Sequence, residues 1–311
     1  MPLRLNSGNS FSRKVPSDPM ASRPMTIRQA INIGTEKIAL RWTETPYLDA
    51  TVILAAVLGS TREKLLACLA DTIEPKAYEA FMKGVEARAA GSPVAYITHR
   101  QEFYALDFYV DSNVLVPRAD TEILVETALE YIKPGSRVLD LCTGSGCIAI
   151  AIKHTVPEAR VEASDISESA LAVFRRNADS ILSGHLMGQL SGQIVTYKSD
   201  LLNSIPGKFD VIVSNPPYLT HAETARMKND SWPEPILALD GGTDGLDFIR
   251  RIITDAADHL LPGGRLLFEA DPAQMGAIKI EFEKYKYNDI IIRKDLAGRD
   301  RVIAGCYSGK D

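Results

Sequence analysis

The stretch RVLDLCTGSGCIAIAIKH, residues 137–154, is the strongest indication of fold in the sequence. Its first residues, Arg137 to Leu141, have the apolar, branched side chains of a buried strand, whereas the segment from Cys147 has a helical pattern. Between them, Gly144 and Gly146 permit positive φ angles and a close approach of backbone amides to a ligand. The stretch therefore predicts a strand, a glycine-rich turn and a helix, as in α/β nucleotide-binding folds.

Short β-branched runs then alternate with helical patterns, as in repeated βα units. The predicted strands begin at Arg137, Arg160, Ile194, Phe209, Gly263, Asp289 and Arg301. The first five are separated by segments long enough for the crossovers that parallel strands require, whereas the last two are joined only by AGRD, residues 297–300. We therefore expect a seven-stranded sheet in which five strands are parallel and one near the C-terminus is antiparallel.

The chain before this unit is predicted to be helical from Met25 to Gly91. Thr45 and Pro46 read as an N-cap and first helical residue, and Thr61 and Pro75 as the starts of two further helices. The aromatic-rich residues 94–116 read as a β-hairpin-like connector. The predicted domains are a disordered extension (1–24), a helical docking domain (25–91), a hairpin linker (92–116) and the α/β domain (117–311).

Composition limits the classes of function. With 311 residues, 45% hydrophobic and 24% charged, the chain suits about two globular domains and excludes collagen-like and coiled-coil proteins. Its net charge of -5 and pI of about 5.7 provide no overall basic field for nucleic acid. We therefore expect no direct nucleic-acid partner.

Cysteine and histidine spacing predicts neither a disulfide framework nor a metal site, because no CxxC pair occurs and the histidines lie apart. The most apolar early run, TVILAAVL at residues 51–58, is far too short to span a bilayer. The basic, serine-containing residues 1–24 could pass for a transit peptide, but they lack an amphipathic apolar face. We expect no membrane association and a cytoplasmic protein.

Two further motifs predict the ligand site. Asp165, at the end of the second strand, could accept hydrogen bonds from the hydroxyls of a ribose. The glycine turn also fits the dinucleotide pattern G-x-G-x-x-A, but a dinucleotide oxidoreductase has no use for Asn215-Pro216-Pro217-Tyr218 after the fourth strand. The proline carbonyls and the Asn215 amide oxygen would instead grip a planar NH2 group beside a methyl donor, next to the aromatic face of Tyr218.

From about Met25 to the C-terminus, the chain resembles the protein-(glutamine-N5) methyltransferases of peptide-chain release factors, which are class I S-adenosylmethionine-dependent enzymes. The segments that carry the resemblance are Gln101–Tyr104, Val116–Arg118 with Thr121–Glu122, Asp140–Gly146, Asp165–Ser167, Ser214–Tyr218, Ala238–Gly242 with Asp244–Leu246, and Lys294–Arg301. The resemblance implies a Rossmann-like domain preceded by a release-factor docking module. It also implies methyl transfer from S-adenosylmethionine to a glutamine side-chain amide in translation termination.

The resemblance also implies roles for particular residues. The methionine part of the cofactor would lie along Cys142, Thr143, Gly144, Ser145 and Gly146, its ribose on Asp165, and its adenine near Asp200 and Leu201. The glutamine would enter between the Asn215 to Tyr218 tetrapeptide and Phe103, and Arg118, Thr121 and Glu122 would border the cofactor. An amide nitrogen activated by orientation requires no His or Lys base, and none is visible.

The chain departs from the family pattern in the cofactor loop and two flanking segments. Cys142 replaces the usual glycine, Ala119-Asp120 replaces Pro-Glu, and Ala270-Asp271 replaces Ile-Gly after Glu269. Two alternatives stay open: a nucleic-acid N-methyltransferase acting on adenine N6 or guanine N2, and a non-catalytic cofactor-binding translation partner in which Cys142 prevents catalysis. A nucleophilic or redox cysteine is disfavoured because no His or resolving Cys accompanies it.

Overall fold

The computed structural model describes residues 24–40, 43–183, 194–230 and 232–309. The predicted disordered extension lies outside the described residues, apart from Pro24. The described chain divides into two compact units between Glu86 and Ala87, and the domain limits given above remain predictions. Within the described residues, no helix has the length and apolarity needed to cross a membrane.

The first unit is helical, as its pattern predicts. Its elements are α1 (Ile27–Ala39), α2 (Pro46–Val57), α3 (Arg62–Ala67) and most of α4 (Pro75–Ala89). The hydroxyl of Thr61 caps α3, and Thr45 and Pro46 are the N-cap and first residue of α2 as predicted, although the Thr45 side chain makes no capping hydrogen bond. The Thr45 hydroxyl donates to Asp49 Oδ1 at 3.2 Å, because this carboxylate in the first turn is the stronger acceptor.

The connector is part helix and part hairpin. Residues 94–98, predicted within the hairpin, form the short helix α5 (Val94–Thr98), which begins after Pro93 and ends at His99 with φ of 54°. Within it, the Thr98 hydroxyl donates to the Val94 carbonyl at 3.0 Å, an interaction that β-branched composition does not reveal. The hairpin itself comprises only β1 (Gln101–Phe103) and β2 (Leu106–Phe108), which pair antiparallel.

The second unit contains the predicted seven-stranded sheet. The strands are β3 (Arg137–Leu141), β4 (Arg160–Asp165), β5 (Val195–Lys198), β6 (Phe209–Ser214), β7 (Leu260–Glu269), β8 (Tyr287–Lys294) and β9 (Asp300–Tyr307). Their order is β5-β4-β3-β6-β7-β9-β8, and the first five of them in the chain are parallel. β9 runs antiparallel to both of its neighbours, β7 and β8, which confirms the prediction of one antiparallel strand near the C-terminus.

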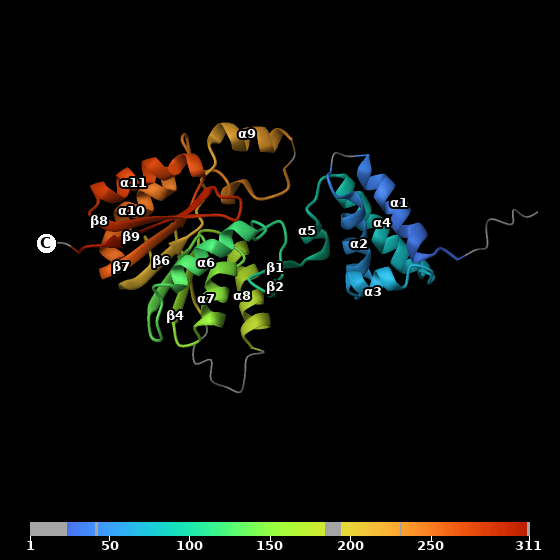
Figure 1. Ribbon diagram of the computed structural model, residues 1–311, viewed down its shortest axis with the longest axis horizontal. Helices are drawn as coiled ribbons and strands as arrows, with labels where there is room; N and C mark the ends of the chain where they lie inside the picture. The colour runs from blue at the N-terminus through green and yellow to red at the C-terminus, as the bar shows by residue number, and fades with distance from the viewer. Residues whose placement is uncertain (1–23, 41–42, 184–193, 231, 310–311) are drawn as a thin grey trace, which may run out of the picture. The chain divides into compact units, whose positions relative to one another are not determined.

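Helices cover both faces of this sheet (Figure 1). The helices are α6 (Glu122–Leu129), α7 (Cys147–Thr155) and α8 (Glu168–Leu182) on one face, and α10 (Asp247–His259) and α11 (Met275–Lys284) on the other. Successive strand residues alternate between the two cores: Val138 packs on the α7 side and Leu139 on the α10 side. The chain turns to opposite sides after β3, which leaves a crevice at the carboxyl ends of β3, β4 and β6.

Candidate active site

A cavity of about 320 Å³ lies at this crevice. One side is formed by residues that follow β3, β4, β5 and β6, and the other by residues 112–118 and by Pro235, Leu237 and Ala238. The predicted site residues that line it are Cys142, Thr143, Gly144, Ser145, Asp165, Asp200, Leu201, Asn215 and Pro217. Sequence motifs spread over four strand ends therefore converge on one cavity.

The turn between β3 and α7 uses its two glycines differently. Both have positive φ, 53° at Gly144 and 85° at Gly146. A Cβ on Gly146 would lie 2.4 Å from the Phe174 ring, so this glycine is required for packing and does not line the cavity. A Cβ on Gly144 would meet nothing within 4 Å, so the backbone there faces open space in the cavity.

Asp140 fixes the turn from beneath. Its Oδ2 accepts hydrogen bonds from the Thr143 hydroxyl at 2.6 Å and the Ala149 amide at 3.2 Å. Burial raises the pKa of Asp140 to about 7, although both hydrogen bonds favour the charged form. Among the described residues, no donor reaches its buried Oδ1, which leaves one acceptor unpaired below the cavity floor.

Asp165, the last residue of β4, lies across the turn. Its Oδ2 accepts from the Gly144 amide and its Oδ1 from the Ser167 amide, both at 2.9 Å. Burial raises the pKa of Asp165, and these amides oppose that shift. Each carboxylate oxygen has two lone pairs, so the side chain remains able to accept further hydrogen bonds from the cavity.

Asp200 and Leu201 follow β5 and complete this end of the cavity. Asp200 pairs with Arg251 Nη2 at 2.8 Å. Leu201 is buried and has a φ of 52°, a backbone conformation that a leucine rarely adopts. Together they offer an acidic and an apolar contact next to the Asp165 carboxylate.

Beyond β6, Asn215 and Pro217 face the cavity. Asn215 Nδ2 donates to the Thr121 hydroxyl at 3.3 Å. No described residue donates a hydrogen bond to the carbonyl of Pro216 or Pro217, and their role as acceptors for a substrate stays a prediction. Gly241 allows the close packing behind them, since a Cβ there would lie 2.6 Å from the Pro217 oxygen.

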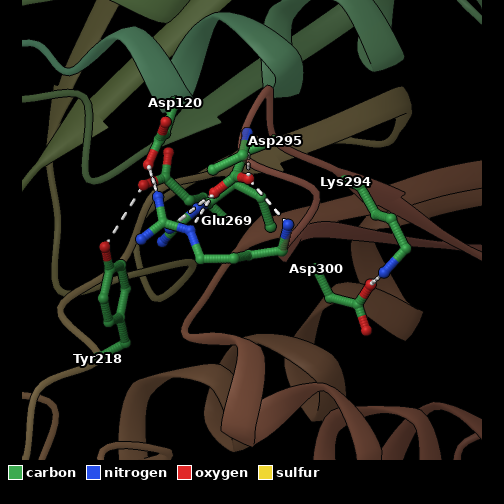
Figure 2. A network of polar contacts seen from close by, with 9 residues as sticks. Asp120, Tyr218, Glu269, Lys294, Asp295 and Asp300 are labelled. Carbon is green, nitrogen blue, oxygen red and sulfur yellow. Dashed lines mark hydrogen bonds and ion pairs between the residues drawn. The ribbon is translucent and has the colours of Figure 1, made fainter.

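Two aromatic residues predicted to contact substrate lie outside the cavity lining. Tyr218 is largely buried, and its hydroxyl donates to Glu269 Oε1 at 3.4 Å (Figure 2). Phe103 is 1% exposed and packs edge-on against Phe108, so its predicted role as a wall of the substrate pocket is wrong. Hydrophobic burial in the hairpin core accounts for Phe103, which the linear motif does not distinguish from an exposed ring.

Of the three residues expected to border the cofactor, Arg118 and Thr121 line the cavity and Glu122 does not. Glu122 Oε1 accepts from the Tyr104 amide at 2.8 Å, which ties α6 to the hairpin. Pro216 likewise is buried and outside the lining. Glu122 and Pro216 therefore do not contact the cavity.

Two segments, residues 112–118 and the segment from Pro235 to Ala238, form the two outer walls of the cavity. The sequence does not predict the contact that joins them. Glu234 is 3% exposed, and its carboxylate accepts from the Val116 amide at 3.0 Å and from Arg118 Nη2 at 2.5 Å. Trp232 Nε1 donates to the same carboxylate at 3.1 Å. We call this arrangement the Glu234 clasp. It connects segments more than a hundred positions apart, so no local pattern predicts it.

The cysteines at the site have inert thiols. Burial raises the pKa of Cys142 strongly and that of Cys147 to about 12, so both thiols are protonated at neutral pH. This disfavours thiolate catalysis, in agreement with the sequence. Within the described ranges, no group of three or more His, Cys, Asp or Glu residues could hold a metal ion.

Comparison with known proteins follows the same division of the chain. A family model of the methyltransferase small domain matches residues 118–230, and one of the PrmC N-terminal domain matches residues 29–98. The chain is 40% identical to the release factor glutamine methyltransferase of Moorella thermoacetica over 281 residues, covering 89% of this chain and 97% of that protein. The corresponding enzyme of Rhodopirellula baltica is 36% identical over 291 residues, with coverage of 90% and 96%.

Solved structures agree on the fold. A methyltransferase from Pyrococcus furiosus superposes with a TM-score of 0.50 at 21% identity, covering 67% of this chain and 91% of that chain. At this identity, the match concerns the arrangement of the sheet and its helices alone.

Proposed function

Because the chain belongs to the release factor glutamine methyltransferases, we propose that it transfers a methyl group from S-adenosylmethionine to the side-chain amide nitrogen, N5, of a glutamine in peptide-chain release factors. The observation that carries this proposal is the meeting of two motifs in one cavity: the Gly144 turn with Asp165, and Asn215 with Pro217. The first suits a nucleoside and the second suits an amide NH2 group.

The chemistry of the cavity lining supports S-adenosylmethionine as the cofactor. Asp165 can accept from the ribose hydroxyls while the Gly144 amide holds it in place, and Leu201 offers an apolar surface for adenine. When bound, S-adenosylmethionine supplies an electrophilic methyl carbon.

The chain's own residues would act by orienting the glutamine. The Asn215 amide oxygen and the free carbonyl of Pro216 or Pro217 would accept the two N–H bonds of the substrate amide, with Tyr218 supporting the loop from behind. Both acceptors are preorganised, so little reorganisation is needed when the nitrogen attacks. The N–C bond would form as the bond between the methyl carbon and the sulfonium sulfur breaks, which leaves a neutral thioether as the departing group. The positively charged amide nitrogen would then release a proton to water, which requires no strong base in the cavity.

The substrate would be recognised away from the cavity as well as within it. The helical unit, which includes most of the match to the PrmC N-terminal domain, is the proposed docking module for the release factor. Its mixed charge suits a protein partner better than a phosphate backbone. A release-factor substrate implies that the enzyme works in the cytoplasm, where translation ends.

The direct test is incubation of the full-length protein with purified release factor and methyl-labelled S-adenosylmethionine. Label should enter a single glutamine, detected by mass spectrometry, and Asn215→Ala should slow its incorporation roughly 100-fold to 1,000-fold while cofactor affinity changes little. Label in RNA or DNA in place of protein would overturn the proposal. Cofactor binding by an enzyme that never transfers label would favour the non-catalytic partner.

The ribose contact has its own test. Asp165→Ala should weaken S-adenosylmethionine binding by about 1.5 to 3 kcal/mol, the range for hydrogen bonds to a charged group, measured by titration calorimetry. Asp179→Ala, an exposed change on α8, is the matched control and should bind as the wild type does. Unchanged affinity in the Asp165 variant would remove this residue from the cofactor site.

A further inference from the structure

The Asn215 side-chain amide can bind the NH2 group of the substrate in only one of its two orientations. Its amide has an oxygen that accepts hydrogen bonds and an NH2 group that donates them. To grip the NH2 of a glutamine, the oxygen must face the cavity, and a flipped Asn215 would oppose donor to donor. Something in the protein must therefore hold the NH2 end of Asn215.

Thr121 is in the position to do so. Its hydroxyl oxygen accepts from Asn215 Nδ2 at 3.3 Å, and the residue is 2% exposed while still lining the cavity. Thr121 is also the N-cap residue of α6, yet its side chain makes no capping hydrogen bond. The hydroxyl is thus not employed in starting the helix, which is the usual role of a threonine there.

A hydroxyl can accept from Asn215 dependably only if its own proton points elsewhere. Glu269, the 2% exposed last residue of β7, is a buried carboxylate to which that proton could point. Burial raises the pKa of Glu269, and the Thr121 hydroxyl is the strongest of the groups that oppose this, ahead of the Arg301 charge. Glu269 Oε1 accepts from Tyr218, whereas no described donor, the Thr121 hydroxyl included, lies in hydrogen-bond geometry with the buried Oε2.

A network of ion pairs holds the segment that bears Thr121 in place (Figure 2). Asp120, the neighbour of Thr121, pairs with Arg301 Nη2 at 3.1 Å, and Arg301 also pairs with Asp295 at 3.2 Å. Arg301 is only 8% exposed, so these pairs are screened little by solvent. The short 3-10 turn that bears Thr121 is thereby tied to β9, directly beside Glu269 on β7.

We propose that Thr121 is a positioning residue for methyl transfer: its hydroxyl accepts from Asn215 Nδ2, and Asn215 Oδ1 is thereby fixed toward the substrate NH2. This relay rests on the proposed function. It acts on the orientation of Asn215 and leaves the cofactor contacts of Gly144 and Asp165 untouched.

The first experiment compares full-length Thr121→Val, which removes the hydroxyl at constant shape, with Thr121→Ser, which restores it. Thr121→Val should lower kcat for release-factor methylation roughly 10- to 100-fold, as expected for a misoriented reacting group, while S-adenosylmethionine affinity changes less than about threefold. Thr121→Ser should recover most of kcat. Thr127→Val is the matched control, because Thr127 is an equally buried threonine of α6 whose hydroxyl donates to the Ile123 carbonyl.

A double-mutant cycle separates positioning from a merely structural role. If Thr121 acts through Asn215, then Thr121→Val in an Asn215→Ala background should reduce kcat by less than about twofold further. If Thr121→Val lowers kcat in the Asn215→Ala background as much as it does in the wild type, the relay is contradicted. If Thr121→Val does not bind the cofactor and is therefore misfolded, Thr121→Ala replaces it in the double-mutant cycle.

A substrate readout checks the orientation itself. Release factor with glutamate in place of the target glutamine presents oxygens where the NH2 should be, and wild-type Asn215 Oδ1 should repel it. Thr121→Val frees Asn215 to turn its NH2 outward, so this competitor should inhibit the variant about tenfold more strongly relative to wild type.

The outcomes distinguish the two proposals. A wild-type enzyme that methylates no release factor contradicts the proposed function itself. A wild type that is active, with Thr121→Val as active as Thr127→Val or with unchanged inhibition by the glutamate competitor, contradicts the relay alone.

Discussion

Cys142 has a φ of 59°, the left-handed region in which a side chain costs about 1 to 2 kcal/mol relative to glycine. The residue lines the cavity and directly precedes the Thr143 to Gly146 turn. A glycine would adopt this φ without that cost, so the strain comes from the Cβ of the residue at this position. The cysteine therefore adds local strain without adding a reactive thiol.

We predict that Cys142→Gly is more stable than Cys142→Ala by about 1 kcal/mol, because alanine keeps the Cβ that is strained at positive φ. Urea unfolding of the two variants measures the difference directly. At Cys147, in the first turn of α7, the order should reverse, with alanine the more stable, because glycine is a poor helix former. Equal stability of the two variants at position 142 would show that the backbone relaxes without strain.

At the level of elements, local pattern was sufficient wherever one short segment determines its own structure. The strands ending in Leu141, Asp165 and Ser214 are predicted because short β-branched runs alternate with helical patterns, as in repeated βα units. The pattern was insufficient for α5 and for Phe103, since a β-branched, aromatic segment fits a short buried helix as well as a hairpin. Long-range packing decides between the two.

The Glu234 clasp gives the element-scale prediction. Glu234→Ala would leave the Val116 amide without its partner and release Arg118, so the two outer walls of the cavity would separate. We expect a loss of about 1 to 3 kcal/mol in the free energy of unfolding and about a tenfold loss in S-adenosylmethionine affinity. Calorimetry and urea unfolding measure the two effects.

The control for the clasp is Glu168→Ala. Glu168 also pairs with an arginine, Arg175, but both side chains are about half exposed, and such surface pairs contribute little. This variant should match the wild type in cofactor affinity and nearly match it in stability. A Glu234 variant that binds the cofactor as well as the Glu168 variant would mean that the walls hold without the clasp.

For the whole molecule, the sequence predicts which site residues lie at the ends of strands. It does not predict which residues from distant segments contact one another. Residues at the ends of β3, β4, β5 and β6 were predicted to converge because parallel strands present their carboxyl ends at one edge. The clasp and the Thr121 contact with Asn215 join segments 118 and 94 positions apart, and single-sequence patterns contain no information on such pairs. Only the folded structure shows those contacts.

The division into two units leads to a prediction about substrate choice. Both large cores of the second unit are built from residues 103 onward, so deletion of residues 1–91 should leave the sheet and the cofactor cavity largely intact. S-adenosylmethionine affinity, measured by calorimetry, should therefore change by less than about threefold, because every cavity residue follows position 111.

Methylation by the same deletion variant should depend on the substrate. Intact release factor should lose far more rate than a short peptide carrying the target glutamine, because the peptide needs only Asn215 and its neighbours, whereas the intact protein also needs the helical docking surface. The ratio of the two rates is the quantity to measure, since any general damage to the enzyme cancels in it. Equal losses on both substrates would mean that the helical unit supports the fold of the catalytic unit and does not recognise the release factor.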